Sequence, residues 1–277
     1  MKLFNLIWLV AILIFPLSVT GNEKVIVMGY KAIAKPPLIG DARDNSGLYV
    51  DLFSKAAEKI GYRLQTVRIP KKRLHKELAL GNIDFYPGSS FSTDRAKYLY
   101  YLPNGLLTKE VLVSLDSIPE ISDMEEAEGT LIIELGSSKS EWDDIYPKIS
   151  LTQMSKLSME SVIRALKVGR GDFYIADIEI VDDYKRRNGI NRFADIGIRI
   201  HHNAINRESI PMYMGFARNS LLFSERPNLE YDPGVRVSIS NFTSIVNKES
   251  VAYRFSEALL QLQKQGDTQR LYDLYFK

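Results

Sequence analysis

Two short segments carry the side chains that typically bind a carboxylate. In residues 88–95 (GSSFSTDR), hydroxyl side chains precede Arg95, whose guanidinium can hold a carboxylate with two charge-assisted hydrogen bonds. In residues 136–141 (GSSKSE), Ser138 and Glu141 fit a capping box, which predicts a helix N-terminus with unpaired backbone N–H groups. A plain structural reading of the first segment stays open, with Ser92 or Thr93 as a helix N-cap and Arg95 on the surface.

A carboxylate of complementary chemistry ends a predicted strand. The strand begins at Asp172 and ends at Asp177. Open α/β sheets form their ligand crevices at the carboxyl ends of strands. Asp177 therefore either pairs with an ammonium group of a ligand or merely turns the chain.

Residues for the common catalytic and metal-binding arrangements are scarce. The chain has 3 His and no Cys, and it lacks the H-E-x-x-H, G-x-S-x-G and Gly-rich phosphate-loop motifs. His201 and His202 are neighbours on a strand and point to opposite faces, so a solvated strand end is expected rather than a metal site. We therefore expect no catalytic residue, no metal and no cofactor.

Length and charge restrict the partners. A chain of 277 residues is long enough for about two domains. Lys and Arg number 36 and Asp and Glu 34, a net charge of +2, which provides no large basic field for a nucleic acid. The basic residues Lys71, Lys72, Arg73 and Lys76 are accordingly expected to form a solvated helix start.

The first 21 residues have the features of a secretory signal peptide. Lys2 precedes an apolar run, residues 6–15, and Val19 and Gly21 fit a cleavage site after Gly21. The apolar run is shorter than the ~20 residues that cross a bilayer. Removing Lys2 leaves 35 basic and 34 acidic residues, and no Cys near the site can carry a lipid. We expect a free protein exported to the periplasm.

From Asn22 the sequence alternates strand and helix patterns, which predicts α/β layers. One apolar helical face, starting at Leu48, ends at Gly61. Residues 219–250 contain several turn formers and no helical period, so a hairpin-like insertion is expected there. Strands are expected at residues 25–30, 63–69, 83–86, 111–113, 131–133 and 211–217, and the last helices around residues 251–262 and 271–275.

A short internal repeat joins these elements. Residues 81–86 (GNIDFY) recur as residues 169–174 (GRGDFY), and each copy follows a helical stretch and opens a strand. The repeat indicates two similar α/β lobes, unless the match arose by chance.

The order and spacing of these motifs resemble the periplasmic solute-binding proteins of ABC importers, specifically the polar amino acid binding family (bacterial extracellular solute-binding protein family 3). The resemblance implies an α/β, two-lobed periplasmic binding protein fold of type II with two hinge crossings. One lobe would contain residues 22–112 and 211–277, and the other residues 113–210. The motifs that carry it are Gly47-x-x-x-Asp51-Leu52, Gly81-x-Ile83-Asp84, Ser92-x-x-Arg95, Gly136-Ser137-Ser138, residues 172–177 and Leu262-x-x-x-Gly266 with Tyr275-Phe276.

The resemblance also implies roles for individual residues. Arg95 would bind the α-carboxylate of a ligand with help from Ser90, the turn of Ser137 and Ser138 would complete that site, and Asp177 would bind the α-amino group. The segment from residue 84 to residue 95 is one residue shorter than the family pattern. The family often places an aromatic ring over the ligand from its first loop, where this chain has Ala34, so Tyr30, or Tyr86 and Phe91, are the expected substitutes.

The function implied is the capture of a small polar ligand, an amino acid above all. The protein would deliver this ligand to the membrane permease of an ABC importer. We expect a monomer that is not an enzyme. A ligand sensor for a membrane receptor is one alternative. A second alternative is an enzyme on this scaffold, similar to the dehydratases of cyclic dienols. That chemistry needs a placed acid or base, which the sequence does not identify.

Overall fold

The structure is a computed structural model that describes residues 23–138 and 146–276. The predicted signal peptide, residues 1–21, lies outside the described residues, as does the predicted capping residue Glu141. Within the described part of the chain, no helix is long and apolar enough to cross a membrane.

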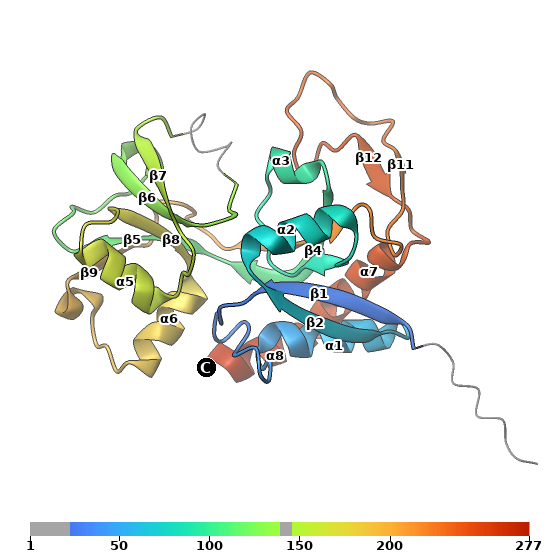
Figure 1. The fold of residues 1–277 in the computed structure, drawn as a ribbon, viewed down its shortest axis with the longest axis horizontal. Helices are drawn as coiled ribbons and strands as arrows, with labels where there is room; N and C mark the ends of the chain where they lie inside the picture. The colour runs from blue at the N-terminus through green and yellow to red at the C-terminus, as the bar shows by residue number, and fades with distance from the viewer. Residues whose placement is uncertain (1–22, 139–145, 277) are drawn as a thin grey trace, which may run out of the picture.

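The chain folds into two lobes, each built on a five-stranded mixed sheet (Figure 1). The first sheet has the order β2-β1-β3-β10-β4, and the second has the order β7-β6-β8-β5-β9. In both orders, the first three strands are parallel to one another. The fourth strand, β10 or β5, runs antiparallel to the third and to the fifth. The first sheet comprises β1 (Val25–Lys31), β2 (Arg63–Ile69), β3 (Phe85–Tyr86), β4 (Leu99–Thr108) and β10 (Ile210–Ala217). The second comprises β5 (Glu110–Leu115), β6 (Gly129–Glu134), β7 (Ile149–Met154), β8 (Phe173–Asp177) and β9 (Ile198–His201).

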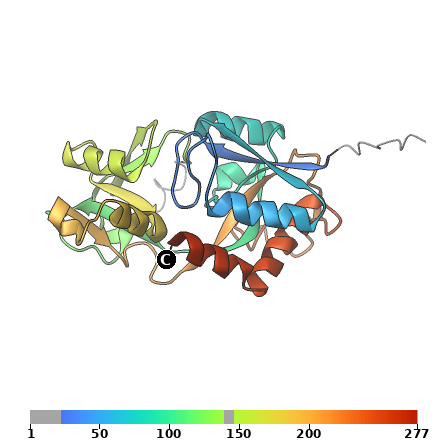
Figure 2. The ribbon, with the colours of Figure 1, turned by 90° about the horizontal axis from the view of Figure 1, so that it is seen from below.

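Helices cover the sheets, and the predicted two-lobed α/β architecture of type II is confirmed. In the first lobe α2 lies on one side of the sheet, whereas α1, α7 and α8 lie on the other (Figure 2). The first lobe holds α1 (Leu48–Lys59), α2 (Lys71–Leu80), α3 (Thr93–Ala96), α7 (Val251–Lys264) and α8 (Asp267–Phe276). The second holds α5 (Met159–Lys167), α6 (Ile178–Arg187) and the 3-10 turns η1 (Met124–Glu126) and η2 (Phe193–Ile196).

The amphipathic pattern of α1 explains its place. Leu48, Leu52, Phe53 and Ala56 recur on one face and are fully buried in the core. The helix ends just before Gly61, which adopts φ +77°, a conformation that costs glycine little. The predicted limits of this helix are therefore confirmed.

The two copies of the repeat occupy equivalent places in the two lobes. The Asp84 carboxylate accepts a hydrogen bond of 2.7 Å from the Val27 N–H of β1. The Asp172 carboxylate accepts one of 2.8 Å from the Thr130 N–H of β6. Each aspartate thus fastens the start of its strand to the neighbouring parallel strand, and the repeat is structural rather than accidental.

The chain passes between the sheets twice. It leaves the first sheet after β4, enters the second at β5 with Lys109 between them, and returns between β9 and β10. The lobe limits predicted from the sequence, residues 22–112 with 211–277 and residues 113–210, stay a proposal.

Residues 219–250 contain a two-stranded antiparallel ladder, so the expected hairpin-like insertion is confirmed. Its strands are β11 (Glu225–Pro227) and β12 (Ser244–Val246). Phe242 stacks on Tyr100 of β4 with ring centroids 4.9 Å apart, and it also meets the ring of Phe91 at 6.0 Å. The insertion is thereby attached to the first lobe.

One prediction about β9 is wrong. His201 is fully buried, whereas His202 is exposed as expected. The Nδ1 atom of His201 accepts from the Ile121 N–H at 3.0 Å, which leaves Nε2 to donate to the Ser114 hydroxyl at 2.8 Å. His201 is therefore a hydrogen-bonded core residue, because the segment after β5 packs over the end of β9.

Candidate functional site: a cleft between the lobes

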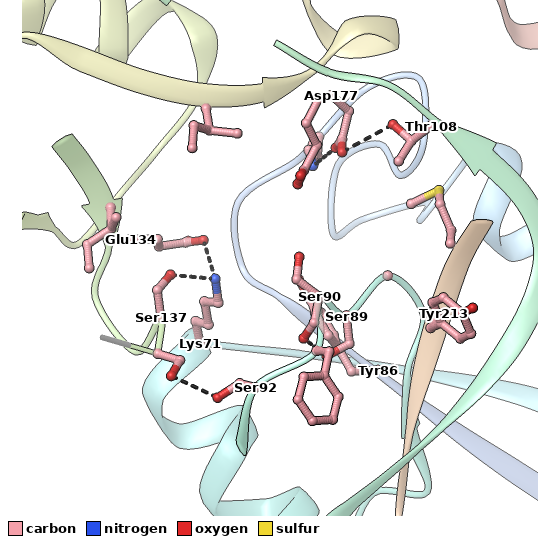
Figure 3. A pocket seen from close by; sticks show the side chains of 18 of the residues that line it. Lys71, Tyr86, Ser89, Ser90, Ser92, Thr108, Glu134, Ser137, Asp177 and Tyr213 are labelled. Carbon is pink, nitrogen blue, oxygen red and sulfur yellow. Dashed lines mark hydrogen bonds and ion pairs between the residues drawn. The ribbon is translucent and has the colours of Figure 1, made fainter. Parts of the chain in front are cut away.

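A cavity of about 540 Å³ lies between the two lobes (Figure 3). Both lobes line it with side chains at or near the carboxyl ends of their strands, where open α/β sheets form ligand crevices. The structure brings together in this cavity all of the predicted site residues: Tyr30, Ser90, Arg95, Ser137, Ser138 and Asp177.

Arg95 lies on α3 in the first lobe and reaches toward the second. It is 8% exposed, and its Nη2 donates a hydrogen bond of 3.0 Å to the Gly136 carbonyl. Among the described residues, no carboxylate lies within 4.0 Å of its guanidinium, so the arginine has charge available for an anion. This placement favours the carboxylate-binding reading over the surface reading.

Gly136 allows the two lobes to meet at this point. Its φ is +95°, and a Cβ atom there would lie 2.8 Å from the backbone nitrogen of Lys72 on α2. A side chain at this position would therefore force the lobes apart.

The serines of the two predicted segments also meet across the cleft. Ser92 precedes α3 as its N-cap residue, but its side chain makes no capping hydrogen bond. Its hydroxyl donates instead to the Ser138 hydroxyl at 2.8 Å. Ser90 is exposed toward the cavity and Ser89 is buried behind it (Figure 3). These hydroxyl groups can complete the coordination of a carboxylate held by Arg95.

Asp177 ends β8, and in this structure it already binds an ammonium group, that of Lys35. One of its carboxylate oxygens is paired with Lys35 Nζ, and the other accepts from the Thr108 hydroxyl at 3.4 Å. Burial alone would lower the pKa of Lys35, but the nearby Asp177 carboxylate and tyrosines raise it well above its usual range. Asp177 can therefore stabilise a cation at this place, but a ligand would meet Lys35 there.

A second ion cluster joins the lobes around Glu134, the last residue of β6. Lys31 Nζ donates to Glu134 Oε2 at 2.9 Å, and Lys71 Nζ lies 3.6 Å from the same oxygen. Lys71 also donates to the Ser137 hydroxyl at 2.9 Å (Figure 3). Burial lowers the pKa of both lysines, that of Lys71 to about 7. Ser137 is thus engaged by a lysine of the opposite lobe.

Glu110 adds a titratable carboxyl group to the cavity. It opens β5 and pairs in register with Asp177 of β8. Burial, and then repulsion by the Asp177 carboxylate, raise the pKa of Glu110 to about 7. This side chain therefore changes its charge near neutral pH.

Tyrosine rings line the cavity. Tyr30 stacks on Tyr86 with centroids 5.5 Å apart and meets the edge of Tyr49 at 5.9 Å. Burial raises the pKa of Tyr86 and Tyr174 to about 12 and that of Tyr30 well above its usual range. These phenols stay neutral and present flat, partly apolar surfaces to a ligand. Ile239 of the insertion also lines the cavity.

The sequence analysis missed the lysines and glutamates of the cleft. Lys31 ends β1, Glu134 ends β6 and Lys71 follows β2, so their positions at strand ends were a signal that could have found them. The prediction of a solvated helix start is confirmed for Lys72 and Arg73, which are exposed. It is wrong for Lys71, because the first residue of α2 faces the opposite lobe.

Comparisons with known proteins agree with this architecture. Residues 26–277 match the model of the bacterial extracellular solute-binding proteins, family 3. None of the curated proteins matches the sequence.

Among solved structures, similar folds occur in binding proteins and in a sensor domain. The substrate-binding protein of an amino acid ABC transporter is 19% identical with a TM-score of 0.62, over 91% of this chain and 99% of that one. A histidine kinase sensor domain with similarity to periplasmic binding proteins is 17% identical with a TM-score of 0.63, over 91% and 96%. An ancestral amino acid-binding protein, a precursor of cyclohexadienyl dehydratase, is 14% identical with a TM-score of 0.60, over 91% and 95%. At these identities the likeness shows the fold.

Proposed function

This chain belongs to family 3 of the bacterial extracellular solute-binding proteins, and on that premise we propose that it captures an α-amino acid between its lobes for an ABC importer. The observation that carries the proposal is that Arg95 and Asp177, from opposite lobes, line one cavity. An α-amino acid presents a carboxylate and an ammonium group to such a pair. A ligand without the carboxylate would leave the Arg95 charge uncompensated, and one without the ammonium group could not replace Lys35 beside Asp177.

Each predicted residue then has a role in binding. Arg95 receives the α-carboxylate, and the hydroxyls of Ser90 and Ser138 complete its hydrogen bonds, with Ser137 beside them in the same turn. Asp177 receives the α-ammonium group, which takes the place of Lys35. Tyr30 supports the wall against which the ligand packs.

The ligand would also control the conformation of the protein. Groups from both lobes contact it, so bound ligand stabilises the closed arrangement over an open one. The membrane permease of the importer would receive the closed form. In this proposal residues 1–21 direct export to the periplasm, and the mature protein acts as a monomer without metal or cofactor.

Binding without chemistry separates this proposal from the dehydratase alternative. That alternative requires a general acid or base, and Glu110, with its pKa near 7, is a described group in the cleft that could serve. Mass spectrometry of the ligand after long incubation distinguishes the two. We expect the ligand to be recovered unchanged, with no loss of water.

A thermal-shift screen tests the ligand class. The panel contains amino acids, their keto-acid analogues, polyamines and dicarboxylates. A ligand at 100 times its Kd adds about 2.7 kcal/mol of stability, so a true ligand gives a clear shift. We expect stabilisation by an amino acid and none by its keto acid. Stabilisation only by keto acids or dicarboxylates would contradict the proposal.

Asp177→Asn provides the matched mutational test. It should weaken amino acid binding by about 2 kcal/mol or more, since the ligand ammonium would face a neutral amide. Asp182→Asn is the control, because Asp182 is exposed on α6. Equal affinities of the two variants would remove Asp177 from the site.

A further inference from the structure

Lys71 is a cleft cation whose charge is incompletely balanced. It is the first residue of α2, and its side chain is 14% exposed. Its ammonium is held by the neutral Ser137 hydroxyl at 2.9 Å, whereas the nearest described carboxylate, Glu134, is 3.6 Å away. In Figure 3 this ammonium lies well apart from Asp177.

The Glu134 carboxylate is shared between two lysines. Lys31 lies closer to it, at 2.9 Å from the same oxygen, and is almost completely buried. Burial lowers the pKa of Lys71 to about 7. The Glu134 carboxylate offsets only part of this effect, and the positive charges of Arg95, Lys31 and Lys35 lower the pKa further. This corner of the cavity therefore has room for one more negative charge.

The charges of the described lining residues lead to the same result. The described residues that line the cavity include four basic and three acidic side chains, and the pKa of one base, Lys71, and of one acid, Glu110, is about 7, so an excess of one positive charge remains. A zwitterion adds no net charge and leaves the cationic excess in place. An amino acid with a cationic side chain would increase it. A ligand with one net negative charge balances it. The cations are Lys31, Lys35, Lys71 and Arg95, and the acids are Glu110, Glu134 and Asp177.

We propose that the ligand is an acidic α-amino acid and that Lys71 receives the anionic end of its side chain. This inference rests on the proposed function, which assigns the α-carboxylate to Arg95 and the α-ammonium to Asp177. The side-chain carboxylate then lies beside Lys71 and relieves its competition with Lys31 for Glu134. Lys71 thereby becomes the residue that selects among amino acids.

The test compares acidic amino acids with their amides on the purified chain. Isothermal titration calorimetry measures the Kd of glutamate, aspartate, glutamine, asparagine and arginine. We expect the better acidic ligand to bind about 30-fold or more tightly than its amide, as for a buried charge pair of about 2 kcal/mol. Arginine should not bind at the same concentrations.

Three variants isolate Lys71. Lys71→Met should reduce the preference for the acid over the amide to about threefold or less, and Lys71→Arg should retain most of it. Lys76→Met is the matched control, because Lys76 is exposed on the same helix, and it should change each Kd by less than about threefold. Melting temperatures without ligand establish that each variant folds.

The outcomes separate the inference from the function on which it rests. If wild-type protein binds glutamine or arginine but neither acid, the inference is overturned and the proposed function stands. An acid preference that survives Lys71→Met removes Lys71 as its cause. If no amino acid binds to the wild type, the proposed function fails, and the inference fails with it.

Discussion

The two walls of the cleft carry opposite charges. In the described lining, every cation comes from the part of the chain built on the first sheet, and every acid lies on a strand of the second sheet, with Arg95 and Lys71 on one side and Glu134 and Asp177 on the other. The ion pairs between Lys31 and Glu134 and between Lys35 and Asp177 therefore cross from lobe to lobe. The lobes attract each other before any ligand binds, so a ligand must replace these contacts as well as bridge them.

The two lobes differ in the charge of their cleft residues although they share one arrangement of strands. Their strand orders correspond position by position, and each uses an aspartate of the repeat to fasten a strand. Equivalent strands nevertheless deliver different chemistry at their carboxyl ends. After β3 the chain continues to the serines and Arg95, whereas β8 ends in Asp177. The framework is thus duplicated, and the short segments after its strands determine what the cleft binds.

The largest expected effect comes from removing Arg95, the cation proposed to bind the ligand carboxylate. Arg95→Ala should weaken binding of the amino acid ligand by roughly 2–5 kcal/mol, because a buried carboxylate would lose its partner. Calorimetry with the ligand identified by thermal shift measures the change. Arg73→Ala is the control, since Arg73 is exposed on α2. Unchanged affinity in Arg95→Ala would exclude this arginine from the site.

Much of the fold and part of the candidate site could be predicted from the sequence, since these features depend on local patterns. The strand from Arg63 to Ile69, the helix that starts at Leu48 and both copies of the repeat have periodicities or turn residues that act over a few positions. Arg95 and Asp177 could be found because hydroxyls or a strand end mark them.

The rest depends on contacts between residues far apart in the chain. Lys35 is 142 residues from Asp177, and Lys31 is 103 residues from Glu134. A strand-end position makes such a lysine a candidate, but no local pattern tells whether it meets solvent or an opposing lobe. The same reason explains the wrong prediction for His201, whose burial depends on a segment about 80 residues away.

The repeat predicts a difference in stability between the lobes. Asp84 is almost fully buried and accepts from Val27 N–H and from the Ser220 hydroxyl at 2.5 Å, whereas Asp172 is exposed. Asp84→Ala leaves one buried and one partly buried donor unpaired and should cost roughly 2–3 kcal/mol of unfolding free energy. Asp172→Ala should cost roughly 0.5–1 kcal/mol. Urea unfolding followed by circular dichroism measures both, and equal costs would contradict the assigned contacts.

A smaller effect on the free energy of unfolding is expected when a change of pH alters the charge of Glu110. The folded-state pKa of Glu110 is raised from 4.5 to about 7, so its contribution to stability is present below pH 4.5 and is lost as the pH rises through 7. Glu110→Gln removes this titration. The variant should exceed the wild type in unfolding free energy by about 1–2 kcal/mol more at pH 8 than at pH 5. Melting curves at the two pH values measure the difference, which is absent if Glu110 is ionised throughout this range.

The smallest effect concerns Lys35, which occupies the place proposed for the ligand ammonium. Its side chain is 27% exposed, so solvent weakens its ion pair with Asp177. Lys35→Met removes a competitor for Asp177 and should strengthen the binding of a neutral amino acid by up to about fivefold. For an acidic amino acid the gain should be smaller, because the same change removes a positive charge from the cleft. Calorimetry with glutamine and glutamate measures both gains. If Lys35→Met weakens both ligands as strongly as Asp177→Asn does, then Lys35 binds the ligand instead of competing with it, and the first wall contributes a second anchoring cation beside Arg95.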